Sequence, residues 1–266
     1  MATITRIGQI VPSSNTTMET EVPAIFRARE LAAPADRTFT FHSSRMRMKK
    51  VSKAELEAMD RDSLRCAAEL ADAPVAVVGY ACLVAIMSMG RGYHRQSEAQ
   101  LGRAMATEGR PTPIVTSAGA LVDELASAGV RRISVVTPYV RPLTDLVVDY
   151  IRHEGIEVQA AIALAIDDNV AVGARDPLAL LDDVDSLDVK GVDAVVLSAC
   201  VQMPSLAAIA RAEDKLGLPV VSASICTARK MMRVLGVEPV VPGMGYFLSE
   251  RNLTPNSLAG DTRAAE

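Results

Sequence analysis

The sequence predicts an α/β fold made of two similar lobes, each a parallel sheet flanked by helices. Two observations support this. Short apolar strands and amphipathic helices alternate along the whole chain of 266 residues, which is typical of parallel sheets. A weak internal repeat relates residues 7–15 to 133–141, and 74–87 to 193–204. We therefore expect lobes at 1–118 and 119–235, and a C-terminal segment, 236–266, that can cross back to the first lobe.

Composition restricts the function classes. Aromatic residues make up only 3% and the net charge is −4, so stacking platforms and basic surfaces for nucleic acid are not expected. The basic group Arg45–Lys50 is short and is interpreted as a solvated loop. No secretory signal is recognisable at the N-terminus, and the apolar run 73–89 is too short for a membrane span. We expect a cytoplasmic protein without nucleic-acid or membrane partners.

The first part of the chain alternates strand and helix twice. Glu19 and Glu21 suit the first turns of a helix, where the positive end of the helix dipole favours acids. Phe39 and Phe41 alternate as in a strand, and Ser52 begins a capping box. The expected elements are strands 5–11 and 36–42 and helices 18–32 and 51–71.

The middle of the chain contains the most apolar strand. Val75 to Tyr80 is rich in β-branched residues, as in a parallel strand that is buried on both faces. The loop Gly90–His94 lacks the three-glycine spacing of a dinucleotide-binding loop. Gly129 closes a helix. The expected elements are strands 75–80 and 112–116, a helix that follows Cys82, and helices 96–107 and 118–128.

The second half repeats this alternation. Leu143, Leu146 and Val147 begin an apolar helical stripe that Gly155 ends. Pro204 is expected in the first turn of a helix. The expected elements are strands 131–137, 156–166, 194–199 and 218–223, helices 143–151, 176–187 and 227–235, a loop at 167–169, and irregular structure after Gly236.

Chemistry is expected where the strands end. In open parallel sheets, ligands bind beyond the carboxyl ends of the strands. If the lobes face each other, the residues at these ends converge on the cleft between them, and they are Asn15, Cys82, Tyr139, Asn169 and Cys200. The sequence has no phosphate-binding loop and no metal-ligand spacing, so no cofactor is expected.

Cys82 and Cys200 occupy matched positions, and each is expected at the start of a helix. A helix N-terminus lowers the pKa of a thiol, and the free amides behind it can bind a carboxylate. Two facing thiols can act as nucleophile and proton donor. The expected carboxylate-binding amides belong to Leu83, Val84, Val201 and Gln202.

A structural role competes with this interpretation for every candidate. A single cysteine at a strand end is often a small buried apolar residue, and only the matched pair favours a functional role for Cys82 and Cys200. Cys66 lies on the apolar stripe of its helix and Cys226 has no counterpart in the other half, so both are interpreted as structural. His94 is the one histidine of interest, and packing within its loop is the preferred interpretation.

Five segments together resemble the maleate cis-trans isomerases of the Asp/Glu racemase superfamily. They are residues 7–21, the sequence around Cys82, Thr137–Tyr139, the sequence around Asn169, and 198–205. The resemblance implies two pseudosymmetric flavodoxin-like lobes with the active site in the cleft, no cofactor, and a homodimer. Several members of that family serve nicotinate degradation.

The resemblance also implies the roles of the site residues. Cys82 would add to the double bond of maleate, and Cys200 would supply the proton. Asn15, Tyr139 and Asn169 would hold the two carboxylates, with backbone amides of Cys82, Leu83, Val84, Val201 and Gln202. A small dicarboxylate, maleate or fumarate, would be the bound partner.

Three alternatives stay open at this point. Amino-acid racemases carry Cys-Asn-Thr and Cys-Thr-Glu, whereas this chain has Cys-Leu-Val at 82–84 and Cys-Val-Gln at 200–202, so polar groups for an ammonium are missing. Arylmalonate decarboxylases lack the first cysteine. A non-catalytic module that binds a dicarboxylate is the third alternative.

Overall fold

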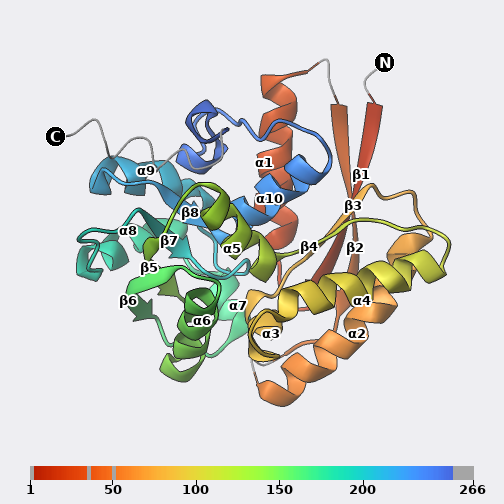
Figure 1. Cartoon of the computed structure of the whole chain (residues 1–266), viewed down its shortest axis with the longest axis horizontal. Helices are drawn as coiled ribbons and strands as arrows, with labels where there is room; N and C mark the ends of the chain where they lie inside the picture. The colour runs from red at the N-terminus through yellow and green to blue at the C-terminus, as the bar shows by residue number, and fades with distance from the viewer. Residues whose placement is uncertain (1–2, 35–36, 50–51, 254–266) are drawn as a thin grey trace.

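The computed structural model of the chain describes residues 3–34, 37–49 and 52–253. It contains two four-stranded parallel sheets with the orders β2-β1-β3-β4 and β6-β5-β7-β8. The two orders are equivalent. In each sheet the first strand of the lobe is an inner strand, the second strand is the edge strand beside it, and the third and fourth strands follow on the opposite side of the first. This confirms the predicted fold class, two parallel-sheet α/β lobes (Figure 1).

The first sheet is centred on two strands that are almost wholly buried. Its strands are β1 (Thr3–Pro12), β2 (Arg37–Met46), β3 (Val77–Tyr80) and β4 (Ile114–Thr116). All four residues of β3 are buried, as expected for an inner parallel strand covered on both faces. The associated helices are α1 (Met18–Ala32), α2 (Lys53–Ala71), α3 (Leu83–Ser88), α4 (Tyr93–Thr107) and α5 (Ser117–Ser127).

The second sheet repeats the arrangement. Its strands are β5 (Arg132–Thr137), β6 (Glu157–Ala163), β7 (Ala194–Ser198) and β8 (Val220–Ser222). The five residues of β7 are all buried. The helices are α6 (Arg141–His153), α7 (Asn169–Gly173), α8 (Leu180–Asp183), α9 (Leu206–Leu216) and α10 (Ala223–Val234).

Helix α10 connects the lobes. It follows the last strand of the second sheet, yet it packs against β3 and β4 of the first sheet and against α1 and α5. Figure 1 shows α5 and α10 between the two sheets. Gly79 in β3 leaves room for this helix, since a Cβ atom there would lie 2.8 Å from Sδ of Met231, and that side chain would have to shift. The boundary predicted at 118/119 falls within α5, and the division into domains stays a prediction.

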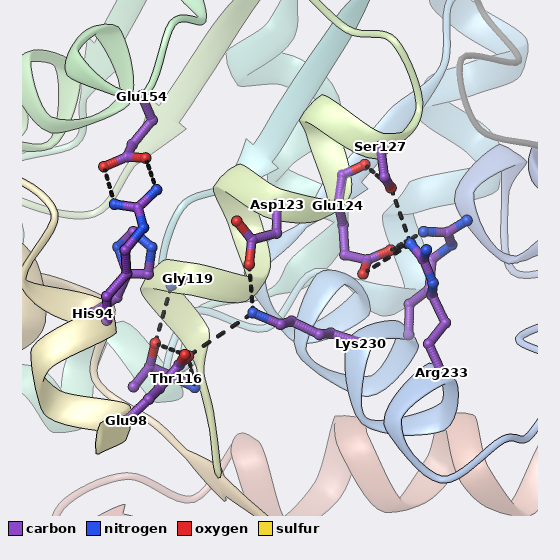
Figure 2. A network of polar contacts seen from close by, with 12 residues as sticks. His94, Glu98, Thr116, Gly119, Asp123, Glu124, Ser127, Glu154, Lys230 and Arg233 are labelled. Atoms are coloured by element: carbon purple, nitrogen blue, oxygen red, sulfur yellow. Dashed lines mark hydrogen bonds and ion pairs between the residues drawn. The ribbon is translucent and has the colours of Figure 1, made fainter. Parts of the chain in front are cut away.

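Ion pairs and a hydrogen bond connect helices that follow different sheets. Figure 2 shows Lys230 of α10 between Asp123 of α5 and Glu98 of α4. In the same region Arg229 of α10 forms a buried ion pair with Glu124 of α5. A further contact joins α4 to α6, where Nδ1 of His94 lies 2.6 Å from the hydroxyl oxygen of Tyr150.

Some element predictions were wrong. The expected helix 176–187 is divided into two 3-10 turns, 177–179 and 184–186, on either side of the short α8. Tyr93 and His94 are not loop residues but open α4, because the glycine turn ends at Gly92. Of the expected loop 167–169, Asp167 and Asp168 do precede a helix, but Asn169 belongs to α7, which Asp168 caps by accepting a hydrogen bond from Ala171 N. Within the described ranges, no helix combines the length and the apolar composition that crossing a membrane requires.

Candidate active site

A small cavity lies between the lobes, at the carboxyl ends of the strands. The space within it measures about 20 Å³, enough for about one water molecule. A ligand larger than a water molecule therefore needs the walls to move apart before it can enter. The cavity is lined by Pro12, Asn15, Met48, Cys82, Val84, Tyr139, Asn169, Cys200, Val201 and Gln202.

The structure brings the five strand-end residues together as expected. Val84, Val201 and Gln202 line the same space, whereas Leu83 does not. Pro12 and Met48 also line the cavity but were not predicted from the sequence. Met48 belongs to the segment expected to be a solvated loop, but its side chain is only 3% exposed. Ser13 explains this, since its hydroxyl exchanges hydrogen bonds with the backbone N–H and C=O of Met48 and draws that segment over the cavity.

Cys82 lies between β3 and α3 in a left-handed backbone conformation. Its φ is 101° and its ψ is 73°, a region that residues other than glycine rarely adopt. Strained residues of this kind concentrate at functional sites. The conformation puts the residue at the N-cap of α3, with its sulfur near the backbone amide of Ala85.

The pKa of the Cys82 thiol is raised to about 12, mainly because the thiol is buried; the Ala85 amide lowers this pKa and the nearby Cys200 sulfur raises it. The expectation that the helix start lowers this pKa was therefore wrong for the closed cavity. The free energy lost when a thiolate is removed from water exceeds the stabilisation that one amide and a helix of six residues provide.

Cys200 does not start a helix. It lies in a turn after β7, and α9 begins only at Leu206, so Pro204 precedes the helix instead of opening it. The hydroxyl of Ser198 fixes the turn by donating to the carbonyls of Cys200 and Met203.

Burial also raises the pKa of the Cys200 thiol. Hydrogen bonds from the Tyr139 hydroxyl and from the amides of Gln202 and Met203 partly oppose this increase. Both cavity thiols are thus held in their neutral form at neutral pH when the cavity is closed.

Asn15 and Asn169 face the cavity from opposite lobes. Oδ1 of Asn15 accepts a hydrogen bond from Met18 N at 3.0 Å and thereby caps α1, which orients the amide. Among the described residues, none accepts a hydrogen bond from Nδ2 of Asn15, which lines the cavity. Nδ2 of Asn169 donates to the Ser14 hydroxyl at 2.8 Å and keeps a second N–H. Both side chains can therefore donate hydrogen bonds to a carboxylate.

Tyr139 completes the wall beside Cys200. Its side chain is buried, and burial raises the pKa of its phenol well above the ordinary value, so it acts as a hydrogen-bond donor. The amide of Ala165 and the hydroxyl of Thr144 both donate to the Tyr139 carbonyl. These contacts hold the loop after β5 in place.

The remaining candidates lie outside the cavity. Cys66 and Cys226 are fully buried in α2 and α10, in agreement with a structural role. His94 is buried in α4 against Tyr150. Across the described ranges, no group of three His, Cys, Asp or Glu side chains is arranged to hold a metal ion.

Comparison with known proteins agrees with this geometry. The sequence profile of the arylmalonate decarboxylase family matches residues 7–248. The maleate isomerase of Pseudomonas putida (strain KT2440) is 58% identical over 249 residues, which cover 94% of this chain and 99% of that protein.

Two solved structures extend the comparison. The maleate isomerase Iso of Pseudomonas putida S16, an alanine mutant crystallised with maleate, is 57% identical, has a TM-score of 0.90, and aligns over 92% of this chain and 98% of its own. The Nocardia farcinica maleate cis-trans isomerase, a cysteine-to-serine mutant with a covalently bound succinylcysteine intermediate, is 42% identical with a TM-score of 0.88, over 93% and 99%.

The shared fold, the two facing cysteines and the near-complete coverage lead to one conclusion. The chain belongs to the maleate isomerases, within the wider arylmalonate decarboxylase family.

Proposed function

We propose that this chain converts maleate to fumarate without a cofactor, with Cys82 as the nucleophile and Cys200 as the proton donor. The observation that carries the proposal is a cavity between the lobes that contains both thiols and three side chains able to donate hydrogen bonds, those of Asn15, Tyr139 and Asn169. The succinylcysteine reported for the Nocardia farcinica protein supports a covalent route.

The steps follow from the chemistry of the double bond. Maleate cannot rotate about its central bond while the π bond is intact. The Cys82 thiolate forms a C–S bond to one alkene carbon, and the π electron pair takes the proton of the Cys200 thiol at the other carbon. The central bond is then single and rotates. Cys200, now a thiolate, removes a proton from that carbon, the C–S bond breaks, and fumarate leaves.

Charge stabilisation is the main task of the remaining residues. The substrate is a dianion and the nucleophile an anion, so attack needs donors where negative charge increases. Asn15, Tyr139 and Asn169 are proposed to bind the two carboxylates together with the amides of Val84, Val201 and Gln202, which line the cavity, whereas Leu83 does not. Loss of one such donor is expected to cost about 3 kcal/mol in the barrier.

Three other interpretations were considered: amino-acid racemase, arylmalonate-type decarboxylase, and non-catalytic dicarboxylate binding. They are not favoured, because relatives that align over more than 90% of the chain are named maleate isomerases. A cytoplasmic location and a homodimer, which the family resemblance implies, form part of the proposal. Light scattering of the purified protein tests the dimer.

Proton NMR of the alkene region tests the function. Purified protein mixed with maleate, without added metal or cofactor, should replace the maleate signal with that of fumarate. A heat signal of binding in calorimetry with no change in the alkene spectrum would instead identify a binding module.

A further inference from the structure

The side chain of Gln202 is buried between the lobes and uses both ends of its amide. Oε1 accepts a hydrogen bond from Thr16 N at 3.0 Å. Nε2 donates to the Ser14 carbonyl at 3.0 Å and to the Asn169 carbonyl at 2.8 Å. The residue is 3% exposed, so these contacts are shielded from water and none is easily replaced.

The three partners lie on two segments of the cavity wall. Ser14 and Thr16 flank Asn15 in the loop between β1 and α1, in the first lobe. Asn169 begins α7, in the second lobe. Gln202 itself lies two residues after Cys200. One amide therefore fixes the relative positions of Asn15, Asn169 and Cys200, three residues proposed to act on the substrate.

A second contact strengthens this connection. The hydroxyl of Thr17 donates to the backbone carbonyl of Gln202 at 2.7 Å. The turn that carries Cys200 is thus bound to the start of α1 through both its backbone and its side chain. Because the partners come from both lobes, the same bonds set the width of the cavity.

Gly173 provides the space for this amide. A Cβ atom at that position would lie 2.3 Å from Nε2 of Gln202, and its three nearest neighbours would all be atoms of Gln202. Gly173 does not have a positive φ, so alanine is compatible with its backbone. Alanine at position 173 therefore acts on the cavity only by displacing Gln202.

We infer that Gln202 is a positioning residue for the isomerisation: its side chain holds Asn15, Asn169 and Cys200 at fixed relative positions across the two lobes. This role rests on the proposed function and adds to it. The side chain itself has its donors and acceptor occupied, so it acts through its neighbours and not on the substrate. Misplacing such groups by about 1 Å can reduce the rate by about a hundredfold.

The first experiment compares Gln202→Ala and Gln202→Glu with the matched control Gln9→Ala. Glutamate keeps the size and the acceptor but loses the donors to Ser14 and Asn169, so any loss in that variant does not come from an empty space. Gln9 is also a buried, hydrogen-bonded glutamine, but its partners, Met18 and Ser43, lie in the first lobe.

Both Gln202 variants should lose about a hundredfold in kcat/KM, with a raised KM as well as a lowered kcat, at a temperature where circular dichroism shows them folded. Gln9→Ala should lose stability to a similar degree but keep kcat and KM. A Gln202 variant within threefold of the wild-type kcat/KM would overturn the inference.

The second experiment is a double-mutant cycle on position 173. Gly173→Ala should reduce kcat/KM strongly in the wild-type background and have no further effect in the Gln202→Ala background, because the displaced amide is then absent. Equal losses in the two backgrounds would contradict the inference. If Gln202→Ala does not fold, Gly173→Ala alone decides the question, since full activity in that variant refutes the role.

The rate of the wild-type protein distinguishes a failure of the positioning role from a failure of the proposed function. No fumarate from the wild-type protein would refute the proposed function. A normal wild-type rate with unaffected Gln202 and Gly173 variants would refute only the positioning role.

Discussion

At the scale of single residues, Cys82 and Cys200 line one cavity; Cys200 is buried and Cys82 is partly buried. Burial raises the pKa of both Cys82 and Cys200. The proposed reaction needs one proton on the pair, with Cys82 as thiolate and Cys200 as thiol. At neutral pH the closed cavity favours two protons, so one proton must leave before the first bond forms.

The pH dependence of kcat/KM follows from this. A raised thiol pKa means less thiolate at pH 7, so kcat/KM should increase about tenfold per pH unit on the acidic side, with an apparent pKa above the ordinary thiol value of about 8.5. This value belongs to the pair. Initial rates between pH 6 and 10 check it, and a profile that is flat from pH 6 to 8 would contradict the pKa directions.

Replacing the nucleophile tests its assignment. Cys82→Ser should retain the fold and lose turnover, because a serine hydroxyl is far less acidic than a thiol and has no neighbouring base among the cavity residues. Cys226→Ser, a change at a buried thiol outside the cavity, serves as the control and should keep its turnover. A near-normal rate in Cys82→Ser would refute the assignment.

At the scale of elements, a hydrogen-bonded cap from α1 to α9 shows how the first lobe supports the segment after Cys200. Glu21 of α1 accepts hydrogen bonds from Ser205 N at 2.6 Å and Leu206 N at 2.7 Å. It therefore caps α9 from the other lobe. Burial raises the pKa of this carboxyl, while the two amides lower it.

Removing this cap should lower the free energy of unfolding. Glu21→Ala leaves the two amides without an acceptor, at a cost of about 1–3 kcal/mol. Glu19→Ala, on the same helix, removes only a partly exposed ion pair with Arg45 and should cost less than about 1 kcal/mol. Urea unfolding of both variants measures the difference, and equal costs would contradict the capping role.

Local patterns predicted most of the elements. The helix 18–32 was predicted with its observed bounds, because acids in its first turns and a polar loop before it are local signals. The segment 176–187 was not predicted correctly: Asp176 caps a 3-10 turn instead of a long helix, and the chain continues as the short α8 and a second 3-10 turn. Short helices such as α7 lack enough residues for a periodic pattern.

At the scale of the whole molecule, the equivalence of the two sheets explains why a weak repeat could predict the site. Matched strand ends bring Cys82 and Cys200 to opposite sides of one cavity. The sequence could not predict the covering by Met48 or the contacts of the Gln202 side chain. Those depend on partners 35 and 186 residues away, for which no local pattern exists.

The buried pair between α5 and α10 should contribute to the stability of the whole chain. Arg229→Met would leave Glu124 buried with only the more exposed Arg233 nearby, at a cost of about 3 kcal/mol. Arg91→Met, which breaks an exposed pair with Asp149 across the lobes, should cost less than about 1 kcal/mol. Thermal and urea unfolding compare the two, and a smaller loss for Arg229→Met would refute this role.

The most direct test of covalent addition by Cys82 uses a variant that cannot complete the reaction. Cys200→Ser should add to maleate slowly and release product even more slowly. After incubation with maleate, mass spectrometry of the intact protein and of its peptides should show one added maleic acid, located on the peptide that contains Cys82. Unmodified protein at saturating maleate, or an adduct on another cysteine, would contradict the account.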